Sequence, residues 1–162
     1  QLTAAMNPCP CGYLGARARA CRCTPDQVAR YQGKLSGPLI DRIDLHVEVA
    51  SLAADELLAA PAGEASGAVR ARCVAARERA LARQGTPNQA LHGKAIDEHA
   101  HLDEAAAKFL HTAATRLAWS ARATHRALKV ARTIADLAGS QGVSVAQVAE
   151  AVRDRRGLRA AF

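Results

Sequence analysis

Four cysteines near the start of the chain have the type and spacing of a metal site. Cys9 and Cys11 form one Cys-x-Cys pair, Cys21 and Cys23 form another, and nine residues separate the pairs. Two such pairs can close on one tetrahedral ion, as in zinc sites built from thiolates alone. In a reducing cytosol this pattern is more often a metal site than a disulfide, although unliganded thiols and redox use stay open. We therefore predict zinc held by these four thiols.

Two polar residues in the same region have positions suited to sensing a nucleotide. Asn7 ends a short apolar run, and a polar residue at the carboxyl end of a strand points into the crevice where α/β proteins bind ligands. Arg42 stands just before a second apolar run. From there it can reach a phosphate on a neighbouring subunit and stabilise charge on a transferring phosphoryl group. The spacing fits equally a surface ion pair of Arg42 with Asp41 or Asp44.

A third candidate is a row of cations in the last third of the chain. Arg122, Arg126 and Lys129 recur at helical spacing, with His125 and Arg132 beside them. Such a helix face can bind a phosphate. A solvated helix stripe accounts for the same spacing.

The elements that must position these residues change character along the chain. The apolar runs predict strands at Leu2–Met6 and Ile43–Val49, the second by its period-two alternation. Helical spacing and capping residues predict helices at 25–35, around 69–83, at 102–117, at 121–138 and from 145 onward. Cys73 lies on the apolar face of the second helix and is expected to be a buried small hydrophobe. The order predicts an α/β segment at residues 1–50 followed by an all-α domain at 51–162.

Composition narrows the class of protein. The chain has 162 residues, of which 49% are hydrophobic but only 3% aromatic, which favours alanine-rich helices over a large sheet-built core. It contains no signal peptide and no apolar run long enough to span a bilayer, so we expect a soluble, cytoplasmic protein without a membrane partner. The net charge of +7 is concentrated after residue 100 and suits either phosphate ligands or solvated helix faces.

Several segments together resemble the ComM/YifB family, the magnesium chelatase-like AAA+ ATPases of bacteria. The resemblance runs through nearly the whole chain, and its most specific part is the first block. The matching segments read AAMNPCPCG at 4–12, CRCT at 21–24, SGPLIDRIDLHV at 36–47, SARA at 120–123 and VARTIADLAG at 130–139.

The resemblance implies a fold and a set of roles. Members of the family form hexameric ATPase rings that act on DNA and promote branch migration in natural transformation. The fold implied is the C-terminal end of an αβα core, with two strands, followed by a helical lid bundle. Asn7 then resembles the sensor-1 residue and Arg42 the arginine finger, whereas Arg122 resembles the sensor-2 arginine, with Arg126 as the other candidate. The implied cofactor is ATP with magnesium.

Other parts of such an ATPase are missing from the sequence. No Gly-x-x-x-x-Gly-Lys-Ser/Thr loop and no acidic strand end for magnesium occur in it. We expect both to lie upstream in a longer protein, and we expect this chain alone not to hydrolyse ATP. Two alternatives are a non-enzymatic zinc-binding, DNA-binding module and a magnesium-chelatase-type motor subunit.

Overall fold

The computed structural model describes residues 2–16, 19–50, 58–59, 61 and 63–156 of the chain. The chain divides into two compact units. Unit 1 comprises Gln1–Ile43, Val47–Ala62 and Leu158–Phe162, and unit 2 comprises Asp44–His46 and Gly63–Gly157. Unit 2 is therefore built from two separate stretches of sequence.

The described part of unit 1 includes the short helices α1 (Pro25–Gln32) and α2 (Gly37–Ile40). The start of α1 is fixed by a capping box: the Gln27 backbone N–H donates to Thr24 Oγ1 (3.3 Å) and the Thr24 N–H donates to Gln27 Oε1 (3.0 Å). This confirms the predicted N-terminus. The helix ends three residues before the predicted residue 35, because Gly33 caps it with an N–H to Ala29 O bond of 2.8 Å.

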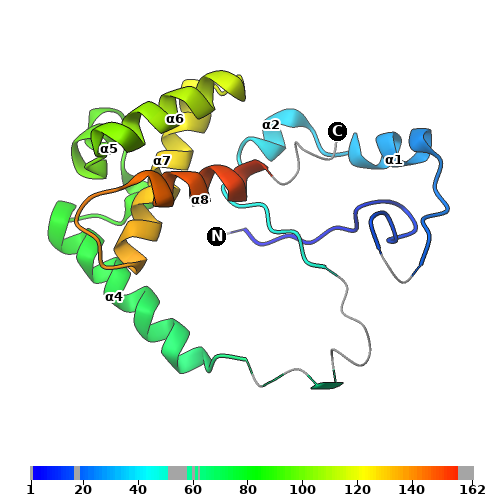
Figure 1. Cartoon of the computed structure of the whole chain (residues 1–162), viewed down its shortest axis with the longest axis horizontal. Helices are drawn as coiled ribbons and strands as arrows, with labels where there is room; N and C mark the ends of the chain where they lie inside the picture. Colours follow the sequence, from blue (N-terminus) through cyan, green and yellow to red (C-terminus); the bar gives the residue numbers. More distant parts are fainter. Residues whose placement is uncertain (1, 17–18, 51–57, 60, 62, 157–162) are drawn as a thin grey trace. The chain divides into compact units, whose positions relative to one another are not determined.

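Unit 2 is a helical bundle. Its helices are α4 (Ser66–Gln84), the 3-10 turn η1 (Asn88–Ala90), α5 (Lys94–Ala100), α6 (Glu104–Arg116), α7 (Ala121–Leu137) and α8 (Val145–Arg156). The central helix is α7, which packs against α4, α5 and α8, while α6 also packs against α8 (Figure 1). Helices α6 and α7 start and end within about two residues of the predicted bounds. In contrast, η1 and α5 were not predicted.

Side-chain caps explain the starts of three of these helices. Asp103 accepts the Ala106 N–H at the start of α6 (2.7 Å), and Ser120 accepts the Ala123 N–H at the start of α7 (3.2 Å). At α8, the Ser144 backbone N–H donates to the side chain of Gln147 (2.9 Å). These caps fix where each helix begins, so the loops between them can stay short.

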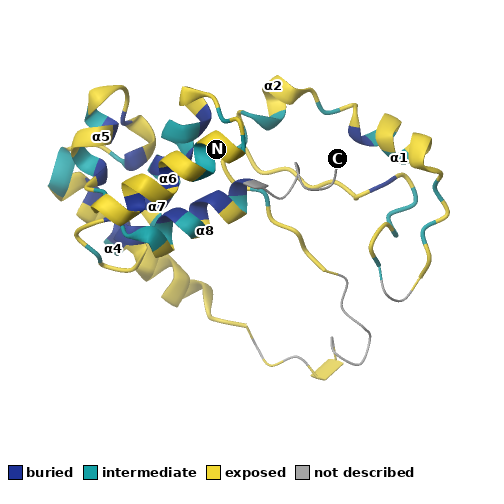
Figure 2. Cartoon of the chain, turned by 45° about the horizontal axis from the view of Figure 1, so that its top comes forward, coloured by how far each residue is buried: buried dark blue, intermediate teal, exposed yellow. Residues whose placement is uncertain are grey.

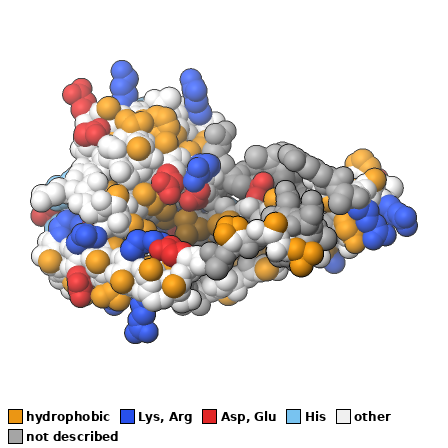
Figure 3. Space-filling view, turned by 60° about the horizontal axis from the view of Figure 1, so that its bottom comes forward, with side chains coloured by type: hydrophobic (Ala, Val, Ile, Leu, Met, Phe, Trp, Pro, Cys, Tyr) orange, Lys and Arg blue, Asp and Glu red, His pale blue; other side chains and the backbone are white. Residues whose placement is uncertain are grey.

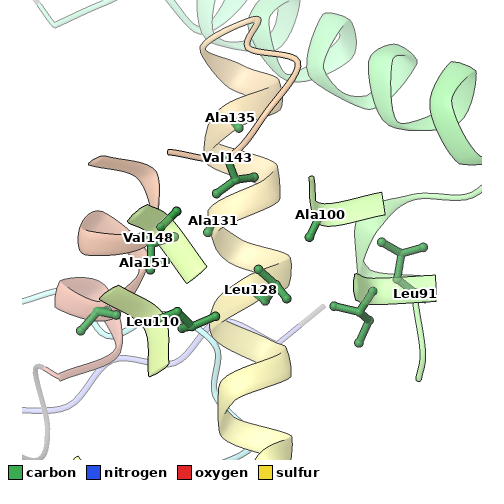
Figure 4. Close-up of a cluster of buried hydrophobic side chains, with 12 residues drawn as sticks. Leu91, Ala100, Leu110, Leu128, Ala131, Ala135, Val143, Val148 and Ala151 are labelled. Atoms are coloured by element: carbon green, nitrogen blue, oxygen red, sulfur yellow. The ribbon is translucent and has the colours of Figure 1, made fainter. Parts of the chain in front are cut away.

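The core of unit 2 is made of small and branched apolar side chains around α7. Figure 4 shows Leu128, Ala131 and Ala135 along α7, with Val148 and Ala151 of α8 facing them. Alanines on α7 leave room for the neighbouring helix backbones to approach closely. The remaining buried members are Leu91, Ile96, Ala100, Ala106, Leu110, Val143 and Val152.

A buried polar network crosses the same bundle. The Asp136 carboxylate accepts hydrogen bonds from both terminal nitrogens of Arg83 (2.6 and 3.0 Å), from Asn88 Nδ2 (2.8 Å) and from Arg132 Nη2 (2.9 Å). Arg132, only 1% exposed, also donates to the carbonyls of Ser140 and Gln141, each at 2.7 Å. One carboxylate thus joins α4, η1 and α7, and Arg132 carries the connection on to the loop before α8.

The two predicted strands, Leu2–Met6 and Ile43–Val49, are not formed in this structure, which has no strand among its described residues. The apolar side chains that alternate in the second run point into solvent: Val47 is 78% exposed and Val49 is 89% exposed. A strand needs a neighbour to pair its backbone groups and a layer to cover its apolar face. Among the described residues, no second strand pairs with either run, and no layer covers Val47 or Val49.

The apolar face predicted for α4 is only half buried. Ala76 and Ala80 are buried, but Val69 and Cys73 on the same face are exposed. Figure 2 shows much of α4 in yellow, the colour of exposed residues. The prediction that Cys73 is buried is therefore wrong. Only the C-terminal half of α4 has α7 against it, so the periodic pattern extends beyond the packed surface.

Among the described helices, none combines the length and the apolar character needed to cross a bilayer.

We expect Asp136→Ala to destabilise unit 2 by ~3–5 kcal/mol, because it leaves the buried guanidinium of Arg132 without its carboxylate. Urea unfolding followed by circular dichroism measures this. The matched control is Arg153→Ala, which breaks an exposed ion pair with Asp154 and is expected to cost less than about 1 kcal/mol. Equal effects of the two substitutions would contradict the role given to the network.

The pH dependence of stability provides a second measurement of the same network. Burial alone raises the pKa of Asp136, but its hydrogen bonds from Arg83 and Asn88 and the charge of Arg132 outweigh burial and lower it. A carboxyl whose pKa is lower in the folded state contributes its full stability above its unfolded pKa and loses it as the pH falls. The wild type should therefore lose stability below about pH 4, and Asp136→Ala should lose less over that range.

Candidate metal centre and phosphate-binding residues

The four predicted cysteine ligands come together in unit 1. The sulfur atoms of Cys9 and Cys11 lie 3.4 Å apart, those of Cys9 and Cys21 3.7 Å, and those of Cys11 and Cys21 3.5 Å. With Cys23 included, all four sulfurs lie within 4.8 Å of one another. A tetrahedral zinc ion with Zn–S bonds of about 2.3 Å separates its sulfurs by roughly 3.8 Å. The arrangement therefore fits one tetrahedral ion.

Tight turns and one long-range hydrogen bond bring these sulfurs together. The Gly12 N–H donates to Cys9 O (3.0 Å), and Gly12 has a φ of +82°, a conformation that favours glycine. From α1, the buried Gln32 donates through Nε2 to Pro8 O (3.0 Å). This bond ties Pro8 to α1. The cysteine loop is defined here as residues 9–16 and 19–23, which follow Pro8 and precede that helix.

The environment separates the acidities of these thiols. Backbone N–H groups of Arg22 and Tyr13 stabilise the Cys11 thiolate and lower its pKa to about 6. Burial raises the pKa of Cys23 to about 12, and the neighbouring sulfurs act in the same direction. The cluster thus mixes thiolate and thiol at neutral pH, and a bound cation would draw off the remaining protons.

A metal at this centre would have a structural role and not a catalytic one. Four thiolates fill a tetrahedral coordination sphere and leave no open position for water or substrate. A metal bound at this centre would also stabilise the fold of unit 1. Cys9 and Gln32 are the only buried residues among those described in this unit. With so little apolar core, a metal clip would be the main constraint on this loop.

Asn7 lies just before the cysteine loop and is exposed. A shallow depression of about 340 Å³ is lined by Ala5, Met6, Asn7 and Tyr31. The Asn7 side chain lies beside Gly12, since a Cβ at that glycine would be 3.7 Å from the Asn7 amide. The amide can therefore donate to a ligand at the edge of unit 1.

Arg42 follows α2 and is exposed, with Nη1 donating to Pro38 O (3.1 Å). Of the carboxylates considered for a surface ion pair, that of Asp44 contacts Arg126 and Arg155 of unit 2. The Arg42 side chain therefore lies at the surface of unit 1.

The cation row on α7 separates into three environments. Arg126 pairs with Asp44 (3.0 Å), and Lys129 donates to Gln89 O (3.0 Å). Arg132, predicted to flank this row, is instead buried against Asp136, because position 132 lies on the core-facing side of the helix. Arg122 stays exposed on the first turn and makes no hydrogen bond or ion pair within the part of the chain that the structure describes.

Sequence reasoning missed the segment that carries Asp44 and His46 into unit 2. The His46 backbone N–H donates to Asp154 O (2.7 Å), and its Nδ1 lies 3.3 Å from Arg155 O. Because a carbonyl only accepts, Nδ1 carries the proton there. Burial lowers the pKa of His46, and its Nε2 has no partner among the described residues. No local pattern could have revealed contacts between residues about a hundred positions apart.

The predicted site residues therefore fall into two groups. The four cysteines and Asn7 adjoin one another in unit 1, which also contains Arg42. Arg122 and Arg126 lie one turn apart on α7 in unit 2.

Comparisons with known proteins identify relatives over nearly the whole chain. Residues 1–57 match the family model of magnesium chelatase, subunit ChlI, and residues 63–155 match that of the ChlI C-terminal region. Competence protein ComM of Haemophilus influenzae is 42% identical over 161 residues, covering 98% of this chain and 31% of that protein. YifB proteins of Salmonella typhimurium and Escherichia coli are each 41% identical over 157 residues, covering 96% of this chain and 30% of each protein. The chain thus spans just under a third of the length of these relatives.

We expect the reduced chain to bind one zinc ion, and Cys11→Ser to lose it, because three thiolates and a hydroxyl bind zinc more weakly than four thiolates. Elemental analysis of the purified protein gives the zinc content. Cys73→Ser is the matched control, since Cys73 is exposed on α4 and lies outside the cluster. A folded wild type that takes up no zinc would rule out the metal centre.

Proposed function

Because the chain belongs to the magnesium chelatase-like ComM/YifB family of AAA+ proteins, we propose that it forms the sensor and helical-lid part of a hexameric ATPase acting on DNA. The observation that carries this proposal is the 42% identity to competence protein ComM over 98% of the chain. The activity proposed is ATP-driven branch migration of DNA in natural transformation. The alternative is a motor subunit of a metal chelatase. The matching family model supports it by name, but the similarity to competence protein ComM does not.

In this proposal Arg42 is the arginine finger. An exposed guanidinium can reach the γ-phosphate bound by a neighbouring subunit, where it stabilises the charge that spreads over the transferring phosphoryl group. The hydrogen bond from Nη1 to Pro38 O helps to orient the side chain. Arg42 therefore acts in trans, which requires an oligomer.

Arg122 is the better sensor-2 candidate of the two on α7. It is exposed on the first turn, where the helix dipole also favours an anion. Arg126 already pairs with Asp44 at 3.0 Å and would have to give up that carboxylate to bind a phosphate. The structural difference between the two arginines supports Arg122 as the phosphate ligand and Arg126 as the residue that holds the segment at Asp44 against α7.

Asn7 is the sensor-1 residue in this proposal. Its exposed amide is oriented beside Gly12, from which it can donate a hydrogen bond to a γ-phosphate oxygen or position the attacking water. The zinc centre follows directly in sequence and would hold Asn7 in a fixed position.

ATP with magnesium fits these residues in part. The exposed cation of Arg122 and the amide of Asn7 match phosphate oxygens. The bound magnesium ion would neutralise charge on the phosphates. The phosphate-binding loop and magnesium ligands are not in this sequence, so they must come from another part of the protein.

We expect Arg42→Ala to lower the ATPase rate about a thousandfold or more in a protein that joins this chain to a phosphate-binding loop, since an arginine finger contributes that much. Mixing tests the trans action. Arg42→Ala subunits and subunits lacking the phosphate-loop lysine, each inactive alone, should regain ATPase activity together, because only mixed interfaces combine an intact finger with an intact loop.

Arg70→Ala is the control, because Arg70 is exposed on α4 and has no proposed role. If mixing restores no activity while both variants still assemble, the arginine does not act in trans. ATPase activity that does not respond to added DNA would favour the chelatase-motor alternative.

We expect alanine substitutions of the two α7 arginines to have different effects on ATP binding and hydrolysis. Arg122→Ala should weaken ATP binding and lower its hydrolysis about tenfold or more, because a phosphate contact is lost. Arg126→Ala should change ATP affinity less and lower the unfolding temperature of unit 2 slightly, because it breaks only a partly exposed ion pair. Isotherms for a fluorescent ATP analogue and thermal unfolding of both variants give the comparison. The reverse ranking would make Arg126 the sensor.

A further inference from the structure

The cysteine loop carries an aromatic and cationic pair on its exposed side. The Arg19 guanidinium carbon lies 4.5 Å from the centre of the Tyr13 ring, and Arg19 Nη1 donates to the Tyr13 hydroxyl at 3.0 Å. Arg19 is exposed and Tyr13 is half-buried. Each partner restricts the other, so a planar ring and a planar cation are held together in one orientation.

Both residues of this pair lie close in sequence to the predicted metal ligands. Tyr13 comes two residues after Cys11, and Arg19 comes two residues before Cys21, so a metal held by these cysteines would restrict the backbone next to each of them. Leu14, which follows Tyr13 in sequence, is 40% exposed and offers an apolar side chain to a ligand. A loop whose only role is to hold a structural metal does not need these exposed side chains.

The electrostatics of this part of the chain favour an anionic partner. Residues 1–35 contain five Lys or Arg and a single acidic residue, Asp26. A zinc ion with four thiolates carries a net charge of about −2, which still leaves the segment positive. In Figure 3, Lys and Arg side chains gather beside hydrophobic ones at the right-hand end of the view, which holds α1 and the cysteine loop.

A second tyrosine in unit 1 repeats the combination. Lys34 Nζ lies 5.9 Å from the centre of the Tyr31 ring, at the end of α1. Gln32 links this helix to the cysteine loop through its bond to Pro8 O. Both tyrosines of the chain therefore lie in unit 1, each with a cation over its ring.

We infer that the cysteine loop is a binding site for single-stranded nucleic acid, with a base stacking against Tyr13 and Arg19 and the backbone phosphates contacting Arg19 and Arg22. Aromatic rings alternating with cations suit an unpaired strand, whose bases expose their faces, better than a duplex, whose bases are stacked. This inference rests on the proposed function, since it assigns the DNA contact of that protein to a place in this chain.

The test is fluorescence anisotropy of a labelled oligothymidylate of about 20 nucleotides with the zinc-loaded, full 162-residue chain. Tyr13→Ala should weaken binding about fivefold or more, whereas Tyr13→Phe, which keeps the ring, should stay within about twofold of the wild type. Arg19→Glu should weaken binding and reduce its salt dependence. Duplex of the same length should bind less tightly than the single strand.

The matched control is Arg70→Glu, which makes the same charge change on the exposed surface of α4 in unit 2 and should change affinity less than twofold. Zinc content is measured for every variant, so that a disrupted loop is not mistaken for a lost contact. Equal losses for Arg19→Glu and Arg70→Glu would reduce the effect to general charge and overturn the site. So would wild-type affinity in Tyr13→Ala, or no binding by the wild type.

Two further outcomes separate this inference from the function it rests on. If oligonucleotide binding fails while the assembled protein still shows DNA-dependent ATPase activity, the DNA contact lies elsewhere and the proposed function stands. If Tyr13→Ala and Arg19→Glu leave oligonucleotide binding unchanged but alter self-association in sedimentation, the loop is a protein contact and the inference is wrong.

Discussion

The helical unit depends on a single buried carboxylate, that of Asp136. Three different elements supply its donors, Arg83 from α4, Asn88 from η1 and Arg132 from α7, and Arg79 of α4 donates to its backbone carbonyl at 2.7 Å. The apolar contacts around it are mostly alanine and valine, whose smooth surfaces specify the register between helices weakly. Paired charges accept far fewer arrangements, because any displacement leaves one of them buried and unpaired. The network therefore selects the helix arrangement that the apolar core stabilises.

Unit 1 is organised by a different force. Its described residues bury almost no apolar surface, and α1, the longer of α1 and α2, has eight residues, too few for a helix to be stable alone. What it has instead are capping bonds, a glycine turn and the four converging sulfurs. A hydrophobic bundle and a thiol-based clip thus lie in one chain, and the groups proposed to contact ATP are divided between them.

The sequence predicted the local features well and the long-range ones poorly. Helix starts at Thr24 and Ser120 were predictable because a cap depends on residues within one turn, and the cysteine cluster was predictable because spacing limits where the sulfurs can lie. Arg132 was misplaced because helical spacing shows which residues share a face but not which face is buried. The two predicted strands did not form, because an alternating pattern favours a strand only where a second strand pairs with it. Local spacing also left Arg122 and Arg126 equivalent, whereas the contact of Arg126 with Asp44 distinguishes them.

Three residues far from the bundle in sequence belong to it in space. Asp44 and His46 contact α7 and α8, and the chain then leaves unit 2 and re-enters it at Gly63. A boundary drawn at the loop before α4 would separate the bundle from this piece of itself and remove the carboxylate that lies beside Arg126 and Arg155.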